Sequence, residues 1–271
     1  MDLLIKTARI SYGIMIAALA VQQIFYREFR PVILPPWPSS LPGHVFFVYL
    51  LSAVLIAASA AIVFNIIAKI ISLTLGGIFL LLIIFFQVPY EIFVDPYYGH
   101  LGTWTQALKE LVFCGGAFVV AGSFPVDRHV EKKENFIIIM LEKLIPFGGV
   151  FVCITMISFG IDHFLYTDGV STLVPNWIPW HIFWTYFAGV ALIASGIAII
   201  LKIQLKRSAL LLSLMIFLWL ILLHIPRAIA DPNSLQGNEV SSVFEAFGFS
   251  GLAYLIAYGY SMKDRAQSGV S

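Results

Sequence analysis

Three histidines and one aspartate are the side chains of this chain best suited to chemistry. His163 closes one apolar segment, His181 opens the next, and His224 lies near the end of the one after that. Segments that cross a membrane alternate in direction, so these three positions are expected at the same face. Asp162 adjoins His163, and an imidazole can hold a proton, bind a metal or orient a hydrogen bond near neutral pH. The spacing therefore predicts one polar cluster at one membrane face.

Three interpretations of this cluster remain open. In the first, the histidines cap helix ends and bond to loop carbonyls, as amphipathic side chains at a membrane interface often do. In the second, they bind a small molecule such as a quinone headgroup, with a histidine donating to its carbonyl oxygen and Asp162 fixing a histidine tautomer. In the third, they hold a metal or haem, for which the ligand types fit but the spacing matches no recognised motif such as H-x-x-x-H.

Further candidates lie beside this cluster or match it elsewhere in the chain. In the quinone interpretation, three tryptophans would supply flat apolar walls: Trp177, Trp180 and Trp184. His44 occupies in the first part of the chain the place that His181 occupies in the second, and is a candidate ligand-binding residue there. Glu110 and Glu245 lie in or beside apolar segments, where a carboxylate holds a proton or cation if buried, or faces water.

The composition identifies the class of protein. The chain has 271 residues, of which 60% are hydrophobic and 11% charged, and its mean hydropathy is +0.92. Soluble domains carry about 25% charged residues, which excludes a soluble enzyme and a disordered chain. The net charge of +1 offers no basic surface for nucleic acid. The chain is therefore expected to be a polytopic membrane protein whose main partner is the lipid bilayer.

Eight apolar segments are long enough to cross a bilayer, for which about 20 residues are needed. They lie near residues 8–27, 44–67, 69–89, 104–123, 144–164, 181–202, 208–226 and 241–261. Twelve of the sixteen lysines and arginines fall on one side of these segments. By the positive-inside rule, that side is cytoplasmic and holds both termini. The start of the chain also fits a cleavable signal peptide, but the repeat described next favours a retained helix.

The two halves of the chain match each other at a fixed offset. Four pairs of identical residues are 137 positions apart: His44 and His181, Tyr49 and Tyr186, Pro89 and Pro226, Gly122 and Gly259. The pattern predicts two tandem four-helix units over residues 1–126 and 144–261, a charged cytoplasmic linker over 127–143 and a cytoplasmic tail over 262–271. Because each unit has an even number of spans, both copies face the same way, related by a pseudo-twofold axis along the membrane normal.

The second half resembles the DoxX family of four-span membrane proteins. The resemblance rests on the segments Phe159-Gly160-Ile161-Asp162-His163-Phe164 and Val174-Pro175-Asn176-Trp177-Ile178-Pro179-Trp180-His181-Ile182-Phe183-Trp184, and it covers the first half more loosely. It implies a four-helix unit per half and a bacterial inner membrane. Some relatives are subunits of quinone-linked oxidoreductases of sulfur compounds, and the family supplies no agreed set of catalytic residues.

These observations lead to a functional expectation. The chain is expected to be an auxiliary or quinone-interacting subunit of a membrane redox system, with its polar site at the periplasmic face and other oxidoreductase subunits as partners. Quinone is the favoured ligand, with haem or a metal as the other options. A small-solute transporter and a scaffold without catalysis are the alternatives. Whether the chain catalyses a reaction is left open by the sequence.

Overall fold

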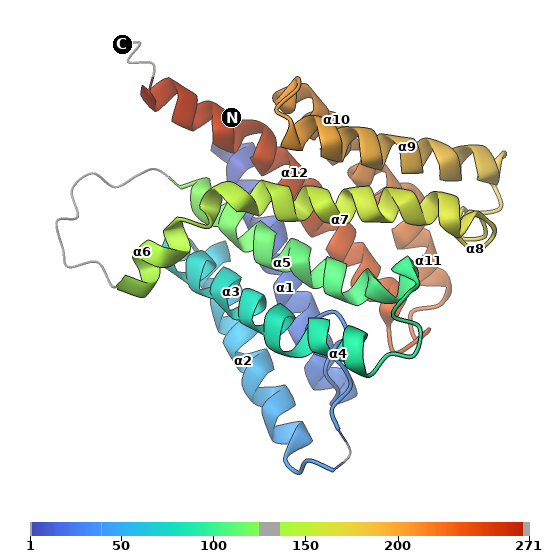
Figure 1. Cartoon of the computed structure of the whole chain (residues 1–271), viewed down its shortest axis with the longest axis horizontal. Helices are drawn as coiled ribbons and strands as arrows, with labels where there is room; N and C mark the ends of the chain where they lie inside the picture. Colours follow the sequence, from blue (N-terminus) through green and yellow to red (C-terminus); the bar gives the residue numbers. More distant parts are fainter. Residues whose placement is uncertain (1, 39, 125–135, 268–271) are drawn as a thin grey trace.

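The computed structural model describes the chain except residues 1, 39, 125–135 and 268–271, and except the side chains of Asp2 and of residues 259–267. Every regular element among the described residues is a helix, as expected. The long helices and the turns that continue them are α1 (Asp2–Tyr26), α2 (His44–Val63), α3 (Ala68–Leu82), η1 (Ile83–Gln87), α4 (Val88–Phe93), α5 (Thr105–Gly122), α7 (Ile145–Leu165), α9 (His181–Ile200), α10 (Leu205–Trp219), η3 (Leu220–His224), α11 (Ile225–Ala230) and α12 (Asn238–Gln267). Figure 1 shows them as one helical bundle.

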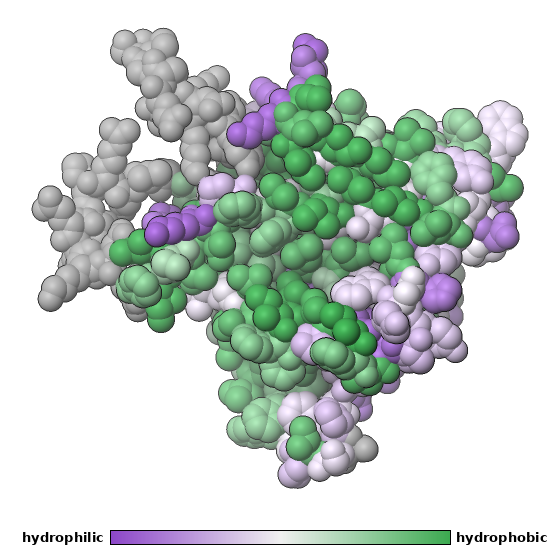
Figure 2. All heavy atoms as spheres, in the orientation of Figure 1, coloured by the Kyte–Doolittle hydropathy of each residue, from purple (hydrophilic) through white to green (hydrophobic). Residues whose placement is uncertain are grey.

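Seven helical segments in the described part of the chain are long and apolar enough to cross a membrane. They are Leu3–Tyr26, His44–Val63, Ala68–Phe93, Ile145–Leu165, His181–Ile200, Leu205–Ala230 and Asn238–Tyr258. Their bounds lie within a few residues of seven of the eight predicted spans. Hydrophobic side chains cover the middle of the face in Figure 2, and paler, more polar residues gather toward its right and lower edges. A multi-pass membrane protein explains both findings, since lipid would cover the apolar band.

The predicted span over 104–123 differs from the other seven. It forms α5, which has 18 residues and carries Lys109 and Glu110 near its start. These two charges and Gln106 lower its hydropathy, so α5 is not among the membrane-crossing segments. It lies instead at the centre of the bundle, where it packs against α3, α7, α12 and α1. Most of its side chains are buried by protein, and its polar residues therefore meet other helices rather than lipid.

Three short helices complete the fold. They are η2 (Leu101–Trp104), α6 (Phe136–Glu142) and α8 (Thr167–Ser171). Residues 127–135 of the predicted linker over 127–143 lie outside the described residues. The described part of the linker contains α6. The predicted tail over 262–271 continues α12 as far as Gln267 and then leaves the described residues.

Helix bounds and bends recur along the chain at the spacing of the sequence pairs. Helices α2 and α9 have 20 residues each, and α3 and α10 have 15. The π-helical turns η1 and η3 each precede a proline, Pro89 or Pro226. Because proline lacks an N–H and its ring clashes with the carbonyl four residues earlier, the helix widens there. The same residue thus places the same bend at two points of the chain.

The long helices pack in a consistent order around the bundle. Helix α1 packs mainly on α2 and α12, α5 on α3 and α7, α9 on α7 and α10, and α10 on α12. Helices α5 and α7 approach closely, because a Cβ at Gly115 or at Gly148 would lie 2.6 Å from the other glycine's carbonyl oxygen. The ends of α1 and α7 and the starts of α2, α5, α9 and α12 lie at one end of the bundle. We call this the His224 end, and the opposite one the linker end.

Candidate functional site

A cavity of about 450 Å³ lies in the second half of the chain at the His224 end. Its walls come from α7, α9, α10, η3 and α12, with α5 and η2 closing one side. Five aromatic side chains make much of its lining: Phe159, Tyr166, Trp184, Trp219 and Phe249. Ligand pockets typically enclose about 300–1,000 Å³ behind mostly apolar walls with a few polar groups, and this cavity has that size and character.

The cavity reaches from the helix ends to the middle of the bundle. Its deepest lining residues are Met156 on α7, Leu192 on α9 and Phe249 on α12. Among the described residues, the lining stops near the middle of these helices, and on α9 it extends no further toward the linker end than Leu192. The cavity therefore lies between the His224 end and the middle of the bundle, and it does not extend to the linker end.

Four of the eight predicted site residues lie on the cavity wall. They are Asp162, His163, Trp184 and His224. The other four lie elsewhere: His181, Trp177, Trp180 and His44. Trp177 and Trp180 are 64% and 76% exposed, respectively, because the loop before α9 turns them outward.

Both histidines outside the cavity have local contacts. His181 is the first residue of α9, and its carbonyl accepts a hydrogen bond from the Thr185 hydroxyl at 2.9 Å. The His44 ring lies in the other half of the molecule, with Nε2 at 3.3 Å from Glu28 Oε2. It packs beside the rings of Phe29 and Trp37. Neither histidine contributes to the cluster that the sequence predicted.

The three histidines do not form a metal site. Within the described residues, no group of three or more histidine, cysteine, aspartate or glutamate side chains is arranged to hold a metal ion. His163 and His224 share the cavity, but His181 is not among the residues that line it. The prediction that His163, His181 and His224 form one ligand set is therefore corrected. Their residue types fit a metal centre, but the start of α9 holds His181 away from the cavity that the other two line.

The tautomer of His163 is fixed by the main chain. Its Nδ1 lies 2.7 Å from the carbonyl oxygen of Phe159, one turn earlier on α7. A carbonyl oxygen can only accept, so Nδ1 carries the proton and Nε2 is left as an acceptor. Phe159, rather than Asp162 as expected, thus orients this ring. Asp162 Oδ1 is buried and has no hydrogen-bond partner among the described residues.

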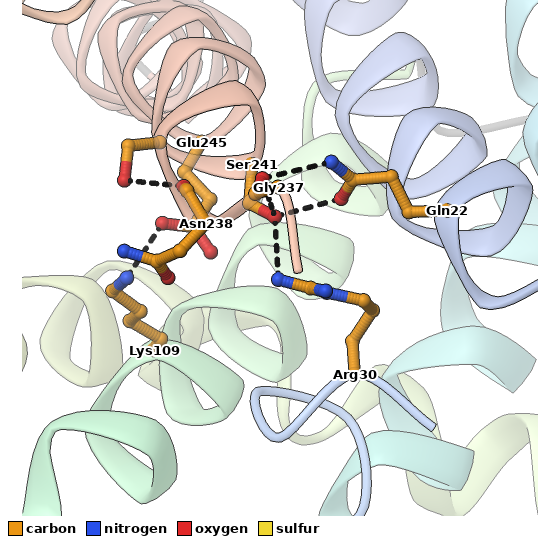
Figure 3. A network of polar contacts seen from close by, with 8 residues as sticks. Gln22, Arg30, Lys109, Gly237, Asn238, Ser241 and Glu245 are labelled. Atoms are coloured by element: carbon orange, nitrogen blue, oxygen red, sulfur yellow. Dashed lines mark hydrogen bonds and ion pairs between the residues drawn. The ribbon is translucent and has the colours of Figure 1, made fainter. Parts of the chain in front are cut away.

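A buried ion pair that the sequence did not predict lines the same cavity. Lys109 Nζ on α5 lies 2.8 Å from Glu245 Oε2 on α12, and the two side chains are 15% and 4% exposed. Figure 3 shows Lys109 reaching across to Glu245. Glu245 was recognised as a carboxylate near a span, but its partner lies in the other half of the sequence. A lysine and a glutamate in separate apolar segments are the signal, because charges within a bilayer usually pair.

Arg30 ties the start of α12 to the first half of the chain. Its guanidinium donates to the Gln236 carbonyl at 2.7 Å and to Ser241 Oγ at 3.0 Å. Ser241 in turn donates to Gln22 Oε1 at 2.7 Å (Figure 3). Desolvation lowers the pKa of Arg30 and nearby Glu245 opposes this change, so the group stays a cation at neutral pH. Glu245 lies one helical turn after Ser241, and the network therefore positions it.

A second ion pair lies next to His224. Arg227 on α11 donates to both carboxylate oxygens of Glu239 on α12, at 2.8 and 2.6 Å. Two parallel charge-assisted hydrogen bonds of this kind hold both partners in a defined geometry. They join α11 to α12 beside the cavity. The site as a whole combines flat apolar walls with proton-holding groups, which suits a ring-bearing amphiphilic molecule.

Comparisons with known proteins give no relative from which the function could be taken. The chain matches no family model, no curated protein and no solved structure.

Proposed function

We propose that the chain binds a quinone-like headgroup in the cavity of its second half, as an auxiliary subunit of a membrane redox system. The observation that carries this proposal is the aromatic cavity of about 450 Å³, with Asp162, His163, His224 and the Lys109–Glu245 pair on its walls. A quinone ring fits between aromatic side chains, and its carbonyl oxygens accept hydrogen bonds from a lysine or histidine. The apolar depth of the cavity would hold the part of the ring nearest the tail.

The architecture that we infer is a tandem pair of four-helix units that resemble the DoxX family. Three features recur 137 positions apart. They are the equal helix lengths, the π-helical turns before both prolines, and the left-handed backbone conformation at Asn65 and Lys202. The packing order also repeats, because the α1–α12 contact corresponds to the α7–α5 contact. In this arrangement α5 corresponds to α12. It is the span that completes the set of eight, and its neighbours shield it from lipid.

The same proposal sets the orientation. Basic residues gather at the linker end, where Lys69 pairs with Glu142 and Arg9 donates to Ser123. The positive-inside rule then places the linker end in the cytoplasm and the His224 end at the periplasmic face of a bacterial inner membrane. A ligand would enter the cavity from the periplasm or from the outer leaflet.

Native mass spectrometry of the protein, gently extracted from its own membrane, tests the proposal. We expect a bound quinone mass on the wild type, and its loss in the double variant His163→Gln/His224→Gln. His181→Gln is the matched control, because His181 does not line the cavity, and it should keep the bound mass. A protein that carries phospholipid alone would refute a quinone site. Equal occupancy in the double variant would show that the molecule binds elsewhere.

A transporter is less well supported by the geometry. Transport requires access to the site from both faces in turn, whereas the cavity stops at the middle of the bundle. A scaffold without a ligand would leave the cavity without a role, and the same mass spectrum tests it.

A further inference from the structure

Two carboxylate oxygens that belong to residues lining the cavity lack hydrogen-bond donors. They are Asp162 Oδ1 and Glu245 Oε1, and both are buried among the described residues without a partner. The side chain of Glu245 is 4% exposed, so water reaches it poorly. An unpaired buried acceptor destabilises the folded protein, and a charged one does so more strongly. A ligand that brings donors to these two oxygens would remove this cost.

The hydroxyl groups of the wall do not donate to these two oxygens in the structure, and the Tyr166 hydroxyl accepts a hydrogen bond from the Gly102 N–H at 3.2 Å. Thr105, Thr185 and Ser242 all line the cavity, and each donates to a main-chain carbonyl. Lys109 already donates to the other oxygen of Glu245. His163 adds a third acceptor, since its Nε2 is unprotonated when Nδ1 donates to Phe159. As the wall is arranged, no protein group donates to the two carboxylate oxygens, and a bound molecule that carries donors could supply them.

We propose that the cavity prefers the reduced, dihydroxy form of its ligand, a quinol, over the oxidised quinone. This inference rests on the proposed function. The two hydroxyl groups of a quinol can donate to Asp162 and Glu245, whereas a quinone carries only carbonyl acceptors and leaves both carboxylates unpaired. The five aromatic side chains of the wall hold either ring, so the hydroxyl protons make the difference. A site of this kind retains the reduced molecule and releases the oxidised one.

Binding of three matched ligands to the full chain in detergent tests this preference. The ligands are a short-chain benzoquinone, its quinol kept reduced under anaerobic conditions, and the dimethyl ether of that quinol, which has the ring and no donors. Titration calorimetry gives each dissociation constant. We expect the quinol to bind at least tenfold more tightly than either of the others.

Two variants assign the preference to the carboxylates. In Asp162→Ala, the quinol should lose at least tenfold in affinity while the quinone changes less than threefold. Glu245→Gln is the second variant, should the first fail to fold. Asp168→Ala is the matched control, because Asp168 is exposed on α8 and does not line the cavity. It should leave the preference unchanged.

Each other outcome overturns a defined part of the inference. Equal binding of quinone and quinol, or of ether and quinol, would overturn the preference and leave a quinone site standing. If neither quinone nor quinol binds, the proposed function itself fails. Tighter binding of an aromatic ammonium ion than of the quinol would show that the carboxylates serve a cation, and would overturn both.

Discussion

The two halves of the molecule end differently at the His224 end. In the first half, the segment after α1 folds inward, and Phe29, Val32, Ile33 and Leu34 are each at most 8% exposed. In the second half, the segment after α7 forms α8 at the end of that helix (Figure 1), and Leu173, 39% exposed, stands on the cavity wall. The first connection buries these four apolar side chains, whereas residues of the second border the cavity together with residues of α7, α9, α10 and α12.

The halves also differ in their polar groups, because the residues that correspond to the buried ion pair are apolar. At an offset of 137 residues, Lys109 corresponds to Ala246 and Glu245 to Leu108. The cavity of the second half thus takes its lysine from α5, a helix of the first half. The cavity therefore combines residues from both halves of the sequence.

The largest effect is expected when this pair is broken. Lys109→Ala should lower the free energy of unfolding by about 3–5 kcal/mol, because it leaves Glu245 buried and uncompensated. The double variant Lys109→Ala/Glu245→Leu, which copies the corresponding residues of the other half, should recover most of the loss. Chemical unfolding in mixed micelles measures both. Lys69→Ala is the control, since Lys69 and Glu142 are about a third exposed, and it should cost at most about 1 kcal/mol. If the single and double variants were equally destabilised, the pair would not account for the loss.

The next effect contrasts the two connections. Ile33 is fully buried, so Ile33→Ala should cost about 2–5 kcal/mol of unfolding free energy. Leu173→Ala, in the segment after α7, should cost less than about 1 kcal/mol, because its side chain borders an open space. The same unfolding assay compares them. Equal losses would mean that the second connection is as tightly packed as the first, and that the chamber is not open in the protein.

Particular residues show how far the sequence alone predicts this structure. Apolar runs predicted eight spans, and seven of them match helices long and apolar enough to cross a membrane, because contact with lipid acts locally on each segment. The remaining predicted span forms α5, and the apolar runs alone did not distinguish it from the others, since its burial depends on the helices around it. Alternating helix direction predicted that Asp162, His163 and His224 lie at one face, and all three line the cavity. His181 was misplaced because direction does not tell toward which neighbour a helix start points.

The closure of the first half and the Lys109–Glu245 pair also escaped prediction. The segment around Ile33 contains prolines and no helical pattern, so nothing local indicates whether it folds inward or outward. Lys109 and Glu245 are 136 residues apart, and their contact depends on how the two halves meet. Such features belong to the tertiary arrangement, which one sequence without its fold does not reveal.

The smallest effect on stability is expected from filling the chamber. Ala188 lies on the cavity wall, and Leu51, at the corresponding place of the first half, packs against the buried core. Leu51→Trp should cost about 1–3 kcal/mol of unfolding free energy, because an indole added to a packed region forces its neighbours to move.

Ala188→Trp should change the unfolding free energy by less than about 1 kcal/mol, because the added ring enters a space of about 450 Å³. The unfolding assay separates the two variants, and the native mass spectrum of Ala188→Trp should show no bound ligand. A destabilised Ala188→Trp beside a tolerated Leu51→Trp would reverse the assignment of open and closed halves. An Ala188→Trp protein that is stable yet still carries its ligand would place the binding site outside this cavity. A stable Ala188→Trp protein without ligand separates binding from folding, because the space is then needed for the bound molecule and not for the bundle.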